Sequence, residues 1–164
     1  MANTYVKIAT VSGTGSSGTL QFTSIPSTYT DLLVKVSARN TSTNDYFEIR
    51  FNGVSTNLSG RALSGEGSGT PTSFSLVPYG RMNGSGTTAS TFASTDIYIP
   101  NYAGATNKSV STDSVSENNG TLAFAVFSAG LWSNTAAITS IELVATGNNF
   151  ATNSTATLYG ILKN

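Results

Sequence analysis

The fold class is decided by the stretch Thr95-Asp96-Ile97-Tyr98-Ile99-Pro100-Asn101-Tyr102-Ala103-Gly104. Polar and apolar side chains alternate up to Ile99, which is typical of a β-strand with one buried face. Pro100 removes a backbone hydrogen-bond donor and ends the strand. The polar residues that follow it favour a turn. The same rhythm, a short alternating strand and then a polar stop, recurs along the whole chain.

The composition suits such a chain of short strands and turns. Ser (24), Thr (25), Asn (15) and Gly (16) supply about half of the 164 residues. Disorder would follow if apolar residues were sparse, but 38% of the chain is hydrophobic and falls in short alternating runs. Thr, Val, Ile, Tyr and Phe suit pleated surfaces, whereas Gly, Asn and Ser suit turns. We therefore expect an all-β protein.

The same alternating pattern predicts several further strands. Alternation is clearest in Asp31–Arg39 and Tyr46–Phe51, and Asn119-Gly120 is a strong hairpin-turn signal. Together they predict a single domain over residues 1–164, a β-sandwich of about eight or nine antiparallel strands, with jelly-roll topology favoured. A barrel or an immunoglobulin-like arrangement stays open, because strand connectivity does not follow from the pattern.

Two stretches depart from the simple pattern. Val54–Ser73 offers few apolar anchors among four glycines, and it is predicted to be a long loop. It is either a surface excursion or an arm that reaches a neighbouring subunit. Phe74–Met82 is predicted to be a strand interrupted at Pro78, which favours a sheet edge or a bulge.

The charge is low and balanced, with eight basic and eight acidic residues and an isoelectric point near 6.1. A nucleic-acid-binding protein normally carries a basic patch, so no direct contact with nucleic acid is expected. No apolar run approaches the roughly 18 residues of a membrane span. The N-terminus also lacks the features of a signal peptide. We expect no membrane partner, and we expect the protein to be made and folded in a cytoplasm.

Residues that usually carry chemistry are scarce. The chain contains no cysteine and no histidine, which removes the common nucleophilic triads and zinc sites. The acidic residues are scattered. Asp113 and Glu117, with Asn118, could contribute to a Ca²⁺ site, but solvated charges beside a turn explain them better. We therefore expect no enzymatic activity, no cofactor and no catalytic or metal site.

Aromatic residues are the more informative group. They fall on predicted outward faces or in loops at Tyr5, Tyr46, Tyr79, Tyr98, Tyr102 and Trp132. Such aromatics supply contact area at interfaces, and they also serve as stacking platforms for carbohydrates. The alternative is that Trp132 and some of the tyrosines cap the ends of the core.

Four stretches together carry a family resemblance. They are Phe22–Leu32 (FTSIPSTYTDL), Ser94–Gly104 (STDIYIPNYAG), Gly130–Ile141 (GLWSNTAAITSI) and Ser154–Ile161 (STATLYGI). In these stretches the chain resembles small virion structural proteins of tailed bacteriophages, including phages of cyanobacteria and other aquatic bacteria. The resemblance marks strand and corner positions rather than a catalytic site.

The resemblance implies a capsid decoration (cement) protein on the virion surface. Such subunits are jelly rolls that assemble as homotrimers and bind the major capsid protein, bridging capsomers and stabilising the head. On this hypothesis Val54–Ser73, with Arg61, and Met1–Tyr5 contact the shell, while Tyr98, Tyr102 and Trp132 contribute to subunit interfaces. A tail receptor-binding or carbohydrate-binding module that recognises a surface glycan is the alternative.

Overall fold

The regular elements of the chain are all β-strands in the computed structural model, which describes residues 4–67, 69–120 and 123–162. In chain order these are β1 (Tyr5–Ser12), β2 (Thr19–Phe22), β3 (Asp31–Ala38), β4 (Tyr46–Phe51), β5 (Leu58–Gly65), β6 (Thr72–Leu76), β7 (Tyr79–Arg81), β8 (Ala93–Ile99), β9 (Lys108–Ser116), β10 (Phe124–Trp132), β11 (Ile141–Ala145) and β12 (Thr155–Ile161). The predicted all-β class is confirmed.

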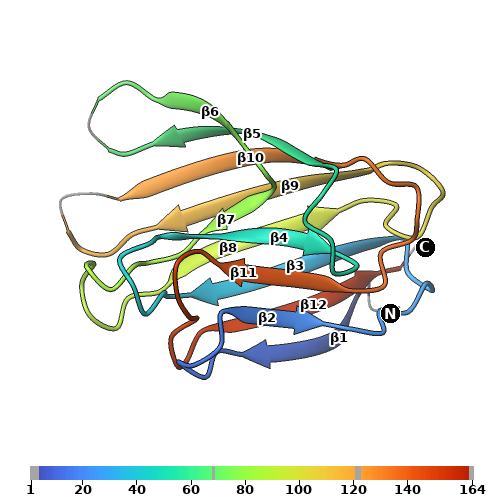
Figure 1. Ribbon diagram of the computed structural model, residues 1–164, viewed down its shortest axis with the longest axis horizontal. Coiled ribbons are helices and arrows are strands. Elements are labelled where there is room, and N and C mark those ends of the chain that lie inside the picture. Colours follow the sequence, from blue (N-terminus) through green and yellow to red (C-terminus); the bar gives the residue numbers. More distant parts are fainter. Residues whose placement is uncertain (1–3, 68, 121–122, 163–164) are drawn as a thin grey trace.

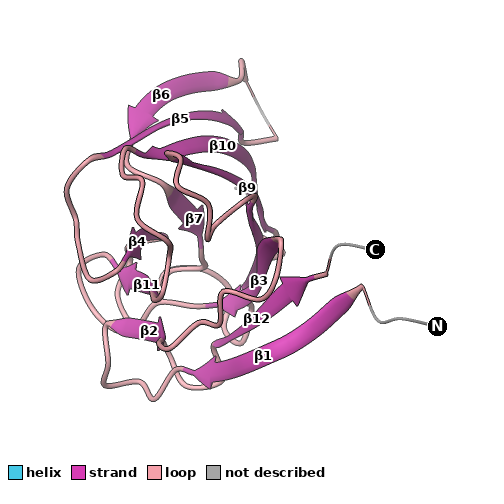
Figure 2. Cartoon of the chain, turned by 90° about the vertical axis from the view of Figure 1, so that its right-hand side faces the viewer, coloured by secondary structure: helices cyan, strands magenta, loops and turns pink. Residues whose placement is uncertain are grey.

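The strands form two antiparallel sheets, one large and one small (Figure 1). The large sheet has the order β1-β12-β3-β8-β9-β10-β5-β6, and the small sheet has the order β2-β11-β4-β7. Figure 2 shows the large sheet as one curved layer with the four strands of the small sheet inside the curve. This is a β-sandwich, as the sequence predicts.

Eight of the strands build a jelly-roll frame. Their pairs are nested along the chain: β1 pairs with β12, β2 with β11, β3 with β8 and β4 with β7. The chain therefore behaves as one long two-stranded ribbon that alternates between the large and the small sheet, which is the jelly-roll arrangement. Within each sheet the nested pairs are joined side by side, by the pairing of β12 with β3 in the large sheet and of β11 with β4 in the small sheet.

The other four strands form what we call the extension. The hairpins β5–β6 and β9–β10 enter the chain between frame strands, and they join the large sheet beside β8 in the order β9-β10-β5-β6. The extension brings the total to twelve strands, more than the eight or nine expected. Figure 1 shows it as the upper part of the molecule.

The extension corrects the prediction of a long loop at Val54–Ser73, because β5 occupies Leu58–Gly65 within that range. Few of its residues favour a strand on their own, since serine and glycine separate the apolar positions. Pairing with β10 along its whole length supplies the backbone hydrogen bonds that the local sequence does not specify. The predicted break at Pro78 is confirmed, since β6 ends before it at the edge of the large sheet.

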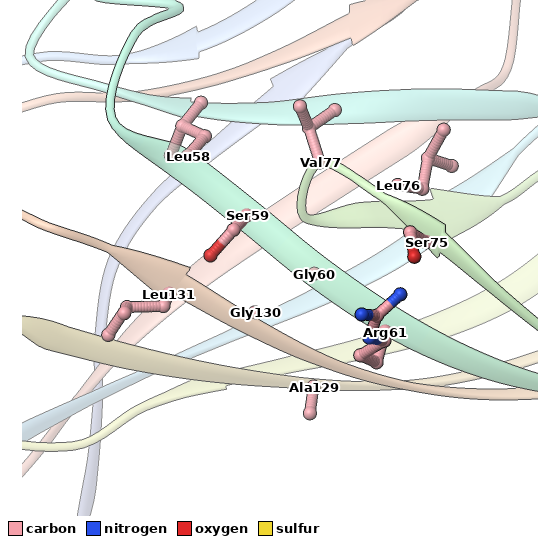
Figure 3. A pocket seen from close by; sticks show the side chains of 10 residues that line it. All are labelled: Leu58, Ser59, Gly60, Arg61, Ser75, Leu76, Val77, Ala129, Gly130 and Leu131. Atoms are coloured by element: carbon pink, nitrogen blue, oxygen red, sulfur yellow. The ribbon is translucent and has the colours of Figure 1, made fainter.

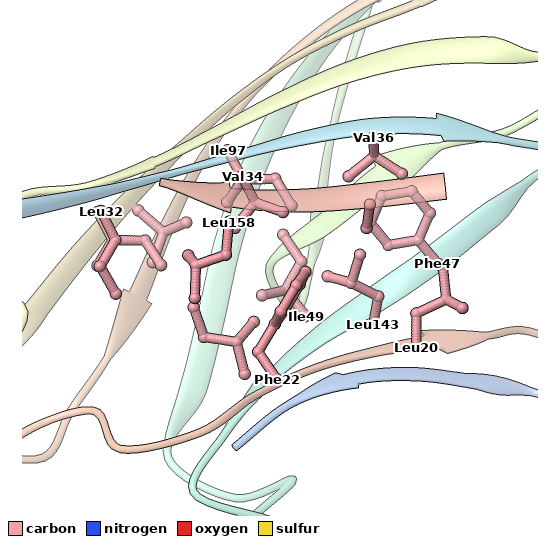
Figure 4. Close-up of a cluster of buried hydrophobic side chains, with 14 of the residues drawn as sticks. Leu20, Phe22, Leu32, Val34, Val36, Phe47, Ile49, Ile97, Leu143 and Leu158 are labelled. Atoms are coloured by element: carbon pink, nitrogen blue, oxygen red, sulfur yellow. The ribbon is translucent and has the colours of Figure 1, made fainter. Parts of the chain in front are cut away.

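The core lies between the two sheets. On β3 the predicted inward residues Leu32, Val34, Val36 and Ala38 are at most 4% exposed. Figure 4 shows side chains from both sheets meeting there, and its labelled residues are Leu20, Phe22, Leu32, Val34, Val36, Phe47, Ile49, Ile97, Leu143 and Leu158. Each such burial is worth about 1.5–3 kcal/mol relative to exposure, so the frame is stabilised chiefly by this layer.

Arg39, which directly follows β3, organises the loop between β7 and β8. Its guanidinium donates hydrogen bonds to the carbonyl oxygens of Ser85 (3.3 Å), Thr87 (3.1 Å), Thr88 (2.9 Å) and Thr91 (3.1 Å). The planar fork reaches several acceptors at once, which the single ammonium of lysine cannot do. One side chain therefore determines the path of this loop.

Replacing Arg39 tests that role. Arg39→Lys is expected to lower the free energy of unfolding by about 1–3 kcal/mol, because several carbonyls lose a charged donor. Urea denaturation measures the change, and amide exchange at residues 85–91 should accelerate. The matched control is Arg50→Lys, whose surface ion pair with Glu48 (2.7 Å) should be worth at most about 1 kcal/mol. Equal losses in the two variants would contradict the organising role.

Tyr79 is the central ring of a second, smaller core beneath the extension. The ring is 3% exposed and packs edge-on against Tyr46 and in a tilted contact against Phe74. Its hydroxyl is buried and has no hydrogen-bond partner among the described residues. Burial raises the pKa of Tyr79 to about 12, because the phenolate would lose its hydration.

Removing this hydroxyl is expected to stabilise the protein. Tyr79→Phe keeps the ring and eliminates an unpaired buried polar group, a gain of about 1–3 kcal/mol. The raised pKa also means that wild-type stability is complete below the unfolded-state value near 10 and falls as the pH rises toward about 12. Denaturant titrations at pH 8, 10 and 11 should show a smaller alkaline loss for Tyr79→Phe. A variant less stable than wild type at pH 8 would contradict this.

Candidate interaction surface

The outer face of the large sheet carries the most unusual side chains. In a strand, alternate residues point to opposite faces, and cross-strand partners point to the same face. Phe127 on β10 pairs with Asp113 on β9 at one side and with Leu63 on β5 at the other. These three outward residues form one row. Ala125 forms the adjacent row with Val115 and Gly65.

Large apolar side chains gather in these two rows. Phe127 is 59% exposed, Leu63 is 55% exposed and Val115 is 48% exposed. We define the apolar patch as Leu63, Val115, Ala125, Phe127 and Ala129, all of them outward residues of β5, β9 and β10. Single exposed apolar residues are ordinary, but a contiguous group on one face marks an interaction site.

Two opposite charges border the patch. Arg61 on β5 pairs with Ala129, and Asp113 on β9 pairs with Phe127, so the two charges lie on opposite sides of β10. Both residues are exposed. The ion pairs within the described ranges involve other residues: Lys35–Asp96, Arg50–Glu48 and Arg81–Asp45. Arg61 and Asp113 are thus available to a partner.

Three of the predicted interface residues are at the surface, and all lie on this face. Arg61 borders the apolar patch. Tyr98 is 37% exposed on β8, two strands from β10, and its hydroxyl donates a 2.8 Å hydrogen bond to Asp31. That hydrogen bond raises the pKa of Tyr98. Tyr5, 56% exposed, lies on β1 at the far edge of the sheet, so the structure does not bring it to the patch.

The other two predicted interface residues are buried, and their prediction as surface residues is wrong. Tyr102 is fully buried, its hydroxyl donating to the Pro26 carbonyl oxygen and accepting from the Tyr29 N–H. Burial raises its pKa. Trp132 is 1% exposed and packs against Phe51 at 5.6 Å between ring centroids. Trp132 falls on an inward position of β10 rather than in a corner, so the core-capping alternative holds for both.

The sequence allows only some of the patch residues to be predicted as outward-facing. Alternation around Val126 places Phe127 on an outward face, and an outward phenylalanine is a usable signal. Leu63 lay in the predicted loop, so its strand position could not be expected. The pairing of β5 with β10 creates the cluster, and that pairing joins segments about 65 residues apart.

A depression of about 570 Å³ adjoins the patch where β5, β6 and β10 come together (Figure 3). It is lined by Leu58, Ser59, Gly60, Arg61, Ser75, Leu76, Val77, Ala129, Gly130 and Leu131. Gly60 and Gly130 allow the chain at Leu76–Pro78 to approach the inner side of β5 and β10 closely, since a Cβ at either position would meet atoms of Leu76 or Pro78 at less than 3 Å. The depression gives a partner's side chain room beside Arg61.

A second, more polar groove of about 790 Å³ lies on the frame part of the same face. Its lining includes Tyr5 on β1 and Tyr159 on β12, and on the neighbouring strands β3 and β8 the Lys35 ammonium donates to Asp96 at 2.6 Å. This hydrogen bond raises the pKa of Lys35. Hydroxyl groups from Ser37, Ser94, Thr155 and Thr157 complete the lining. Tyrosine rings beside hydroxyl and charged groups can hold a sugar by stacking and hydrogen bonding.

The remaining charged residues of the described ranges do not form a metal site, and the buried Lys108 has a structural role. No group of three His, Cys, Asp or Glu side chains comes together within the described ranges. Lys108, fully buried, donates to the carbonyl oxygens of Gly104 (2.7 Å) and Thr106 and so holds the turn before β9. Burial lowers the pKa of Lys108. Across the part of the chain that the structure describes, there is no helix long and apolar enough to span a membrane.

No family model matches the chain, and neither the curated proteins nor the solved structures include a match. The case for a function therefore rests on the surface itself.

The apolar patch should contribute little to folding. Phe127→Ser is expected to change the free energy of unfolding by less than about 0.5–1 kcal/mol, because the side chain is largely exposed. Phe51→Ala, which removes a fully buried ring, should cost about 3–5 kcal/mol. Urea denaturation compares the two. A loss in Phe127→Ser as large as in Phe51→Ala would show that the patch serves the fold rather than a partner.

Proposed function

We propose that the chain is a non-enzymatic structural protein of a tailed-bacteriophage virion, a capsid decoration protein that binds the major capsid protein and copies of itself. The apolar patch carries this proposal. A chain with zero formal net charge that exposes Phe127, Leu63 and Val115 together on one sheet face is suited to contact by area. The resemblance in four stretches of sequence supplies the virion setting.

Decoration would work through buried surface and not through a reaction. The patch lies on the outer face of the extension, on the side of the large sheet that faces away from the small sheet (Figure 2). Burying the patch against neighbouring subunits removes apolar area from water, at about 25 cal/mol per Å². A protein that binds only the assembled lattice stabilises that lattice by mass action. Balanced charge avoids repulsion between closely packed copies.

The position of the protein on the virion tests this proposal. Antibody labelling of virions followed by negative-stain microscopy, or a virion reconstruction, is expected to place the protein over the head. Heads that lack the protein should bind it when it is added back, and Phe127→Ser should bind more weakly than wild type because the patch is lost. Leu162→Ser, which alters an exposed apolar side chain directly after β12 and outside the patch, is the matched control. Label confined to the tail would overturn the decoration role.

The polar groove favours a second candidate, a receptor-binding or carbohydrate-binding module of the tail. Tyr5 and Tyr159 line this groove together with hydroxyl groups and the Lys35–Asp96 pair. Glycan-array binding that is lost in both Tyr5→Ala and Tyr159→Ala but kept in Phe127→Ser would support it. An array without hits would count against it. The apolar patch favours decoration over this candidate, because a glycan site needs no such surface.

A further inference from the structure

We propose that the apolar patch is covered by the same patch of a second copy of this chain, with a two-fold axis running along β10. The inference rests on the part of the proposed function that assigns the patch to an interface, and it does not depend on the virion setting. The molecule that covers the patch is a second copy of the chain, and the two-fold axis sets the register of the contact. The resemblance to decoration proteins implies a trimer, so the two expectations differ in a measurable way.

The placement of the charges is the first argument. Arg61 and Asp113 flank the patch on opposite sides, on β5 and β9, and each lacks an ion-pair partner within the described ranges. A two-fold axis along β10 places β9 of one copy over β5 of the other. Arg61 of each copy then lies on the same side of the axis as Asp113 of the other, one outward row away along the strands. One symmetric contact satisfies all four charges, which is the complementarity an isologous interface requires.

The cross-strand register makes this pairing specific. Arg61 shares its row with Ala129 and Ser111, whereas Asp113 lies two residues further along β9. After the rotation, the partner subunit's Arg61 stands over Ser111, about 7 Å along the strand from Asp113. A guanidinium on its flexible stem spans such a distance and can engage the carboxylate with two N–H groups.

The sizes of the side chains provide a second, independent argument. In the next row, the rotation sets Val115 over the partner subunit's Gly65. A Cβ at Gly65 would meet nothing within 4 Å among the described atoms, so open space remains there for a branched side chain. Along β10 itself, Phe127 lies between the small residues Ala125 and Ala129. The two Phe127 rings therefore meet at the axis with little to obstruct them.

The curvature of the large sheet and the zero net charge of the chain are both compatible with a dimer contact limited to a few strands. The large sheet curves with its outer face away from the small sheet (Figure 2), so two outer faces touch over a few strands only. The three strands that carry the patch are therefore the natural contact, and the charges at its border close the two sides. Zero formal net charge removes the long-range repulsion that would oppose two identical chains.

The first test is the oligomeric state of the purified full-length protein. Analytical ultracentrifugation over about 1–200 µM is expected to show a monomer–dimer equilibrium. Phe127→Ser should raise the dimer dissociation constant at least about tenfold, as for a central aromatic anchor. Leu162→Ser, which alters an exposed apolar side chain outside the patch, should leave it within about twofold. A protein that stays monomeric throughout, or that forms trimers, overturns the two-fold pairing; the first result would assign the patch to another protein.

A charge exchange tests the register. Arg61→Glu alone and Asp113→Arg alone each place like charges together at both symmetric positions, and each should weaken dimerisation at least about tenfold. The double variant Arg61→Glu with Asp113→Arg restores both attractions and should return within about threefold of wild type. Failure of the double variant to recover, with circular dichroism and thermal midpoints unchanged, overturns the proposed register.

The two proposals fail separately. Ultracentrifugation uses the free protein, whereas the decoration role is read from the virion. A dimer that labels only the tail keeps the pairing and removes the decoration role. A monomer that labels the head removes the pairing and keeps the decoration role.

Discussion

The double pairing of β8 is the constraint on which the rest of the structure depends. On one side β8 hydrogen-bonds to β3 of the jelly-roll frame, and on the other side it hydrogen-bonds to β9 of the extension. Its inward residues Ile97 and Ile99 are fully buried between the sheets. The strand is thus anchored by the main core and at the same time serves as the template for the added strands, so the large sheet continues without a break past the edge of the small one.

The extension is attached to the frame by a different kind of interior. Behind β9, hydroxyl groups replace apolar side chains: Thr95 donates to Ser114 at 2.9 Å and Thr112 donates to the Tyr79 carbonyl oxygen at 3.0 Å. The short strand β7 is the edge strand of the small sheet and pairs only with β4 there, and the Thr112 and Thr95 hydroxyl groups bond the backbone carbonyls of its residues Tyr79 and Arg81. Nearby, the Arg81 guanidinium lies 3.6 Å from the centre of the Phe124 ring. The inner side of the extension therefore combines these polar contacts with the small apolar core of Ala62, Tyr79 and Val126, while Phe127, Leu63 and Val115 face outward.

The two ends of the outer face of the large sheet carry different side chains. Over the frame, the outer residues are hydroxyl-bearing or charged, and they form a groove with a paired lysine and aspartate. Over the extension, the outer residues include Phe127, Leu63 and Val115, with two unpaired charges at the border. Contact by area suits the second region, and ligand recognition by hydrogen bonding suits the first. The decoration and glycan-binding proposals thus concern separate regions of one sheet.

The sequence by itself determined the all-β class, the sandwich and most of the core, because each of these depends on local alternation. The alternation within a single strand is enough to predict that residues such as Leu32, Val34 and Val36 point inward. Only the tertiary structure decided the extension, the apolar patch and the burial of Tyr102 and Trp132. Leu63 and Phe127 become neighbours through a pairing between distant segments, and Tyr102 is buried because its turn folds back onto Pro26. A local pattern says which residues share a face of one strand, whereas a surface is made by the strands that pairing brings side by side.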